Sequence, residues 1–337
     1  MSELIEWKNY GVIVVEPNPW DYVVWADSPV DIEIINPSGN NIPYAPDEEN
    51  QSGNGDKMDC VTVSSAWSME TIFRILIALN KLPQNTRAWL LKWNFFDKDG
   101  NVRISTRWAA IQNGTTKEGN SANTVAEWWR KNWFIPEWML PNDQTLNWNQ
   151  FYNTAVITDE MRKCAKESLD VFSIYYKWIL KDSDYKSSLQ QWAVQVLTPV
   201  CPGWSTKSPI PTCNLDVAHA TELLNVQGDG KKDIWDSYDP HHKIFASDYP
   251  VPYRMLYIVK PKIQNNQNIM TFKQIKWQNN IYACNDVSKI KSLVNDMPTL
   301  QGLYELTGEK SFTVVDNLNG YTDCSMKSFL WLDRIIN

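Results

Sequence analysis

The sequence predicts an α+β fold in which helices come first and strands second. Between residues 60 and 82, apolar residues recur at helical spacing, at Val63, Trp67, Ile72, Ile75 and Leu79. After Pro199 the chain changes to short β-branched and aromatic runs typical of strands, such as VAHATELLNV and RMLYIVK. The 337 residues are 43% hydrophobic and include 18 Trp, which is enough apolar surface for a globular core.

Three regions follow in order along the chain. Residues 1–59 are rich in Pro, Asn, Gly and Asp, so we expect an extended arm with strands at GVIVV and VDIEII, ending in the polar loop EENQSGNGDKMD. Residues 60–262 form the main domain, with helices expected over 60–82, 84–97, 121–133 and 159–181 and strands at VAHATELLNV, DIWDSY and RMLYIVK. Residues 263–337 form a small α+β module, with strands FKQIKW and IYAC and helices near 286–297 and 325–336.

Three residues in the main domain form a candidate catalytic set. Cys60 opens the first strong helix, His219 lies in an apolar strand, and Asp236 follows it by 17 residues (236 − 219). A thiol nucleophile needs a base to take its proton, and the base needs a third group that orients its ring. A helix N-terminus also favours the thiolate. Taken singly, the Cys and His could be buried core residues and Asp236 a turn former.

Further residues around this set resemble the papain family of cysteine peptidases. In that family a Ser follows the nucleophile by four positions and a Glu by ten, as Ser64 and Glu70 follow here. The family base lies in a His-Ala strand, which resembles His219-Ala220. The third member is usually Asn followed by Ser-Trp, whereas this chain reads DSY from Asp236. The resemblance implies two subdomains packed against each other. A helical subdomain would carry Cys60, and a β-sheet or barrel subdomain would carry His219 and Asp236.

The match is more detailed with papain-like proteins encoded by tailed bacteriophages. Shared features are an E-x-Q string at 49–51, DxxxCVTVS from Asp56, a GTT…GNS segment at 114–121 and FIPE at 134–137. The ordered set covers about residues 45–260. It implies a phage-encoded protein that resides in the host cytoplasm or in the virion and contacts other virion proteins.

The same resemblance implies which residues bind the substrate. The oxyanion hole would combine the backbone N–H of the nucleophile with an upstream side chain, for which Gln51 and Asn54 are both candidates. Asn54 lies at the usual offset of six residues before Cys60 (60 − 6), while Gln51 belongs to the shared string and is the favoured candidate. Gly119 and Asn120 would pair with the substrate backbone, although an ordinary helix-entry loop is the alternative. Trp204 is expected as a wall of the cleft.

Charge and composition exclude other classes of function. A net charge of −7 without a basic run disfavours nucleic-acid binding. His241 and His242 could pair with Asp239 or Asp248, but no Cys or His cluster supports a metal site, and the reaction needs no cofactor. The N-terminus lacks a basic region followed by a long apolar run, so we expect no signal peptide and no membrane span. Cys201 and Cys213 flank a Pro-rich loop, and we expect reduced thiols there rather than a disulfide.

The sequence therefore predicts a cysteine peptidase that acts on peptide or protein substrates. An alternative enzyme would cleave peptidoglycan cross-peptides as an endopeptidase or amidase. An alternative of another class is a structural tail or capsid protein that reuses the fold, because a fold does not fix a function.

Overall fold

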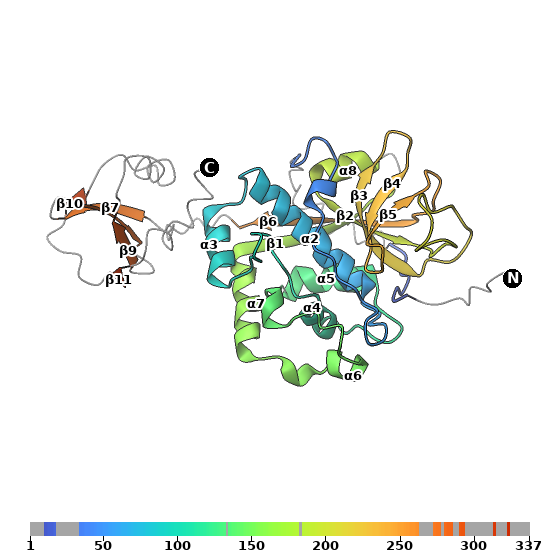
Figure 1. Cartoon of the computed structure of the whole chain (residues 1–337), viewed down its shortest axis with the longest axis horizontal. Helices are drawn as coiled ribbons and strands as arrows, with labels where there is room; N and C mark the ends of the chain where they lie inside the picture. Colours follow the sequence, from blue (N-terminus) through green and yellow to red (C-terminus); the bar gives the residue numbers. More distant parts are fainter. Residues whose placement is uncertain are drawn as a thin grey trace. The chain divides into compact units, whose positions relative to one another are not determined.

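The computed structural model describes residues 10–17, 34–132, 134–181 and 184–262, together with five strands between 272 and 323. The chain divides into two compact units, Met1–Ile263 and Gln264–Asn337 (Figure 1). The candidate catalytic residues all lie in the first unit.

The helices of the first unit are concentrated before residue 172. They are α2 (Cys60–Ala78), α3 (Gln84–Lys92), α4 (Thr106–Gln112), α5 (Ala122–Asn132), α6 (Trp148–Phe151), α7 (Asp159–Val171) and α8 (Tyr185–Gln191), with short 3₁₀ turns η1 (Ile42–Tyr44), η2 (Glu137–Met139) and η3 (Thr154–Val156). Both α2 and α3 end earlier than the sequence predicts. Asn80 and Asn94 follow them with φ angles of 52° and 54°, a left-handed conformation that stops a helix.

The sheet of the first unit is wholly antiparallel and has the strand order β1-β6-β2-β3-β4-β5. Its strands are β1 (Phe172–Trp178), β2 (Ala193–Thr198), β3 (His219–Val226), β4 (Lys232–Trp235), β5 (His242–Phe245) and β6 (Tyr253–Pro261). Helix α2 packs against β3, β2 and β6 on one side and against α4 and α5 on the other (Figure 1). The helix therefore lies between the sheet and helices α4 and α5, whereas α8 packs on β2 and β3.

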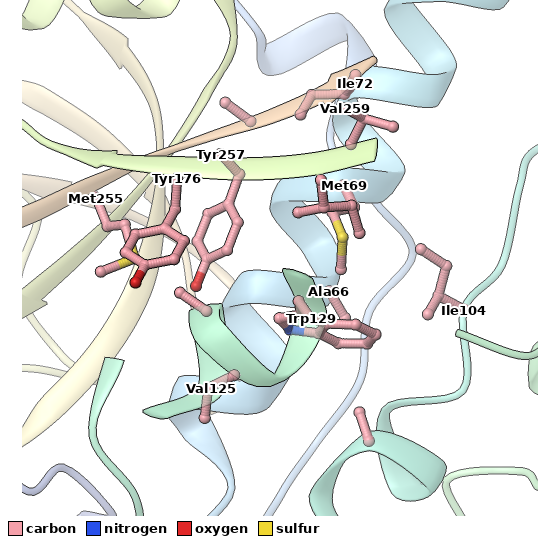
Figure 2. Close-up of a cluster of buried hydrophobic side chains, with 14 of the residues drawn as sticks. Ala66, Met69, Ile72, Ile104, Val125, Trp129, Tyr176, Met255, Tyr257 and Val259 are labelled. Carbon is pink, nitrogen blue, oxygen red and sulfur yellow. The ribbon is translucent and has the colours of Figure 1, made fainter. Parts of the chain in front are cut away.

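The central position of α2 explains its composition. Every residue from Cys60 to Phe73 is buried. By length and composition α2 is also apolar enough to cross a membrane, but 89% of its most apolar window is buried inside the protein, as in a core helix. In Figure 2, Met69 and Ile72 of α2 lie among Trp129 of α5 and Tyr257 and Val259 of β6.

One predicted helix is partly a strand. The sequence predicts a helix over 159–181, but α7 ends at Val171 and β1 begins at Phe172. The segment FSIYYKW alternates more and less buried positions and pairs with Met255–Pro261 of β6. This period of two, together with the β-branched and aromatic residues, favours a strand.

The N-terminal arm differs from the expectation as well. The segment GVIVV forms no strand, because its sheet-like contact is a single bridge between Val12 and Asn120. Most of VDIEII lies outside the described residues, and Ile34 and Ile35 are not in a strand.

Cys201 and Cys213 form a disulfide, so the expectation of reduced thiols is wrong. Ile210 lies between them and donates its N–H to the Ile244 carbonyl at 2.7 Å, which ties the loop to β5. The two Cα atoms are 5.6 Å apart as a result of this folding, which the spacing in the sequence does not reveal.

The second unit contains a five-stranded sheet in the order β10-β7-β8-β9-β11. Its strands are β7 (Phe272–Trp277), β8 (Asn280–Asn285), β9 (Ile290–Leu293), β10 (Thr313–Val314) and β11 (Thr322–Asp323). The helix predicted near 286–297 is wrong at its centre, because β9 pairs there with Tyr282–Asn285 of β8. The helix predicted near 325–336 lies outside the described residues.

Candidate active site

The fold brings Cys60, His219 and Asp236 together from three elements. Cys60 is the first residue of α2, His219 is the first residue of β3, and Asp236 directly follows β4, which pairs with β3. His219 Nε2 lies 2.5 Å from Asp236 Oδ1. The Cys60 sulfur faces the backbone N–H of Ala220, the residue after His219. All three side chains are fully buried.

The two ring nitrogens of His219 have different environments. Nε2 contacts Asp236, whereas Nδ1 is buried and has no hydrogen-bond partner among the described residues. A buried imidazole nitrogen without a partner is costly unless it faces a group with which it exchanges a proton. Since Nε2 is engaged with Asp236, Nδ1 is the ring nitrogen left to act as a base, and the residue after His219 acts on the Cys60 thiol through its N–H.

The electrostatic environment of Cys60 favours the neutral thiol in this conformation. Burial raises the pKa of Cys60 well above its ordinary value, and the nearby carboxylates of Asp56 and Asp59 act in the same direction. The Ala220 N–H lowers this pKa but does not outweigh burial. A helix N-terminus alone would favour the thiolate, but burial of the site favours the neutral thiol of Cys60 instead.

Asp236 is held by three donors. Its Oδ1 contacts His219, and its Oδ2 accepts from Lys243 Nζ at 2.5 Å and from Trp204 Nε1 at 2.8 Å. Burial raises the pKa of Asp236, but His219 and Lys243 outweigh it, so the pKa lies below its ordinary value. Lys243 does not stand out in the sequence, because only the pairing of β4 with β5 brings it to Asp236.

Trp204 lies behind the catalytic set. Its ring is buried and meets the His219 ring edge-on, with the centroids 5.5 Å apart, and its N–H is used by Asp236. The sequence predicts a cleft wall at this position. In the structure Trp204 supports the imidazole and the carboxylate from the protein interior.

The structure separates the two candidates for the oxyanion hole. Gln51 is buried, and its Nε2 donates to the Tyr238 hydroxyl at 2.6 Å and to Asp56 Oδ1 at 3.0 Å. The Tyr238 ring centroid is 5.1 Å from that of His219. Asn54, in contrast, is exposed and donates to the Thr145 carbonyl at 3.0 Å. Gln51 is therefore placed beside the catalytic set and Asn54 is not.

Asn120 hydrogen-bonds to the backbone of this chain itself, and Gly119 lies against the same segment while its own backbone pairs with Thr116. Residues 10–13, here called the N-terminal strap, cross the site between Asn120 and Ala218. Tyr10 N–H donates to the Ala218 carbonyl at 3.1 Å, Asn120 N–H donates to the Gly11 carbonyl at 3.0 Å, and Ile13 N–H donates to the Asn120 carbonyl at 2.8 Å.

Two glycines allow the strap to approach this closely. A Cβ atom on Gly119 would lie 2.0 Å from the Gly11 carbonyl oxygen, and one on Gly11 would lie 2.5 Å from the Met58 carbonyl oxygen. The Tyr10 ring also packs on the catalytic set, with its centroid 6.0 Å from that of His219. The strap thus covers the site and completes its burial. The sequence signals it only weakly, as a Tyr-Gly pair before an apolar run.

Ser64 and Glu70, which follow Cys60 on α2 by four and ten residues, are both hydrogen-bonded in the interior. Ser64 Oγ donates to the Cys60 carbonyl at 2.6 Å and accepts from Gln195 Nε2 at 2.7 Å. Glu70 is buried and accepts the Ile104 N–H at 2.6 Å. Sequence reasoning found Ser64 and Glu70 but missed Gln195, which reaches α2 from the middle of β2.

The remaining histidines do not share a ligand set. His241 Nε2 lies 3.2 Å from Asp239, whereas His242 Nε2 lies 3.2 Å from Asp233. Within the described residues no group of three or more His, Cys, Asp and Glu side chains is arranged to hold a metal ion.

No protein-family model and no curated protein matches this chain. Among solved structures it is similar to xylellain, a cysteine protease from Xylella fastidiosa, with a TM-score of 0.50 and 14% identity over 75% of this chain and 96% of xylellain. The bromelain protease of Ananas comosus aligns with a TM-score of 0.42 and 10% identity over 67% of this chain and 98% of bromelain. Procathepsin L 3 of the Tenebrio molitor larval midgut aligns with a TM-score of 0.43 and 11% identity over 76% of each chain. The similarity to xylellain confirms the predicted papain-like α+β fold.

Proposed function

We propose that this chain is a cysteine peptidase in which Cys60 is the nucleophile, His219 the base and Asp236 the residue that orients the base. The observation that carries the proposal is the arrangement of the His219 ring. One nitrogen is held by Asp236 at 2.5 Å, and the other is buried without a partner beside the peptide that contacts the Cys60 sulfur. The papain-like fold supports the same assignment.

In the proposed reaction His219 Nδ1 takes the thiol proton, and the thiolate attacks the carbonyl carbon of the scissile peptide. The oxyanion that forms accepts hydrogen bonds from the Cys60 N–H and from Gln51 Nε2, which exchanges one of its contacts with Tyr238 and Asp56 for the oxyanion. His219 then gives its proton to the leaving amine, which departs as the thioester forms. Water, deprotonated by His219, attacks the thioester, and the carboxylic acid leaves while the proton returns to the thiolate.

A substrate can reach this site only after the N-terminal strap has moved. Gly119 lies against Gly11, and Asn120 already pairs with Gly11 and Ile13. We therefore propose that the described conformation is a latent form. When the strap leaves, the same backbone groups of Asn120 and Ala218 become free to pair with an extended substrate, which is the role that the sequence predicts for Gly119 and Asn120.

Hydrolysis of fluorescein-labelled casein by a chain with a displaced strap tests the proposal. Gly11→Ala displaces the strap because no Cβ fits against Met58. Adding Cys60→Ala to Gly11→Ala should lower the rate by about three or more orders of magnitude, because the nucleophile and base act as a unit. Adding Cys164→Ala, which removes the other free buried thiol of the described region, is the control and should leave the rate unchanged. Equal rates with and without Cys60 would disprove the peptidase assignment.

The phage motifs support a finer proposal. We propose that the protein is phage-encoded and resides in the host cytoplasm or the virion, where it contacts other virion proteins. Purified virions probed with an antibody to this chain would test the location. Release of peptides from purified peptidoglycan, assayed beside casein, would identify cross-peptide cleavage as the activity.

One observation favours a structural protein as the second candidate. Cys60, His219 and Asp236 are all fully buried, as expected of a site that no longer receives a substrate. On this view Gly11→Ala would cleave neither casein nor peptidoglycan, even though Cys60 becomes accessible to iodoacetamide.

A further inference from the structure

Lys243 is a buried cation at the back of the catalytic set. It lies in β5, and only 2% of its side chain is exposed. Its ammonium donates to Asp236 Oδ2 at 2.5 Å, to the Pro240 carbonyl at 2.5 Å and to the Tyr238 carbonyl. An ammonium has three N–H donors, so these three acceptors use its full capacity.

The two oxygens of Asp236 have separate partners. Oδ1 faces His219, while Oδ2 faces Lys243 and Trp204. Lys243 therefore contacts the carboxylate on the side away from the imidazole and prevents it from rotating. The ammonium also lies 5.6 Å from the centre of the Trp204 ring, which fixes the second donor to Oδ2.

Charge balance follows from the same contacts. A carboxylate next to His219 would by itself stabilise the imidazolium form. Lys243 places one positive charge on the same carboxylate, so the pair is neutral overall. Other titratable groups around the ring are the phenols of Tyr10 and Tyr238 and the thiol of Cys60, and Asp56 lies behind Tyr238 at 2.5 Å from its hydroxyl. His241 lies beside Asp236 as well, but its Nδ1 is 2.6 Å from the backbone carbonyl of Asp236 and its Nε2 is 3.2 Å from Asp239, so Lys243 is the cation that contacts the Asp236 carboxylate.

We propose that Lys243 is a positioning residue that neutralises Asp236 and fixes its carboxylate, so that Asp236 acts on His219 as a neutral hydrogen-bond acceptor would. The inference rests on the proposed function for its catalytic meaning. The charge balance itself concerns only the protonation of His219 and is measurable without catalysis.

A double-mutant cycle at Asp236 and Lys243 in the full-length chain, read out as the titration midpoint of His219, tests the proposal. The protein has three histidines, so the imidazole titration of His219 can be followed by NMR with ¹³C-labelled histidine and assigned with His241→Gln and His242→Gln. Lys243→Met leaves a net negative charge and should raise the midpoint of the His219 titration by about one pH unit. Asp236→Asn leaves the positive charge of Lys243 without a carboxylate partner and should lower the His219 midpoint by a similar amount.

The double variant is decisive. Asp236→Asn combined with Lys243→Met restores neutrality and should return the midpoint to within about half a pH unit of the parent value. Lys232→Met is the matched control, because Lys232 is also buried but donates to the Ser247 carbonyl, and it should leave the midpoint unchanged.

Two results would overturn the inference. One is a midpoint that stays fixed, or rises, in Asp236→Asn. The other is a control variant that shifts the midpoint as much as Lys243→Met does. If Lys243→Met fails to fold, the comparison of Asp236→Asn with the double variant still decides, because these two proteins differ only in the charge at Lys243 and the double variant buries no unpaired charge; the double variant should have the higher midpoint. Casein hydrolysis in the same variants separates the two proposals, since a correct double-mutant cycle in an inactive protein would disprove only the peptidase function.

Discussion

Gly11→Ala is predicted to open the active site by displacing the N-terminal strap. A Cβ atom at Gly11 would lie 2.5 Å from the carbonyl oxygen and 2.9 Å from the Cα atom of Met58. These are backbone atoms that cannot turn aside. The φ angle of Gly11 is +106°, a conformation that side chains with a Cβ rarely adopt. The alanine therefore cannot occupy the closed position.

The size of the effect follows from the contacts that hold the strap. Three backbone hydrogen bonds join it to Asn120 and Ala218. At about 0.5–1.5 kcal/mol net for each hydrogen bond, closure is favoured by about 1.5–4.5 kcal/mol. Since about 1.4 kcal/mol corresponds to a factor of ten, the closed form should exceed the open form by roughly ten- to thousand-fold. A reagent that needs the open form reacts more slowly by the same factor.

The assay is the rate at which iodoacetamide alkylates Cys60, followed by mass spectrometry of the Cys60 peptide at pH 7.5. Gly11→Ala should increase this rate by about ten- to thousand-fold over the parent. Cys164 is buried elsewhere in the unit and serves as an internal reference whose rate should not change. Val14→Ala is the control variant, because Val14 lies next to the strap with 42% of its surface exposed.

An unchanged Cys60 rate in Gly11→Ala would refute the reasoning, provided that the variant melts cooperatively. So would parallel acceleration at Cys60 and Cys164, because that pattern reports general destabilisation rather than opening of one site.

Two further predictions concern stability. Replacing both Cys201 and Cys213 by Ser should lower the free energy of unfolding by about 3 kcal/mol, which is the chain-entropy value for a loop of this length. Urea denaturation measures this change, and an unchanged midpoint would contradict the disulfide. Burial raises the pKa of Glu222 to about 8, so this carboxyl is neutral in the folded chain and ionised in the unfolded chain from about pH 4.5 upward. It therefore lowers stability by at most about 1.4 kcal/mol per pH unit between those values, and Glu222→Gln should remove this slope from urea denaturation profiles; equal slopes in both proteins would show that Glu222 does not carry it.

The elements of the main domain were predictable where local patterns are strong. The apolar residues of α2 and the runs that became β3, β4 and β6 carry clear periodicities. The prediction failed where neighbouring patterns merge or are short. FSIYYKW follows α7 without a turn signal, and α4 and α8 have only 7 residues each, so tertiary packing decides their state.

Cys60, His219 and Asp236 were identifiable from sequence because each lies in a short motif with a chemical reason for its residue type. Such motifs identify the residues but do not give the distances between their side chains. The sequence favoured Gln51 over Asn54 but kept both as candidates, and the structure places Gln51 beside Tyr238 and Asn54 against Thr145.

The sequence alone determined the fold class through local periodicity, and it identified the candidate nucleophile, base and orienting residue through side-chain chemistry and through the resemblance of their motifs to the papain family. Only the tertiary structure decided that Lys243 balances Asp236, that Cys201 bonds to Cys213, and that residues 10–13 cover the site. Each of these contacts joins elements whose approach is set by sheet pairing and by packing on α2. Long-range pairing of this kind leaves no periodic trace in the chain, since it depends on the free energy of the whole fold.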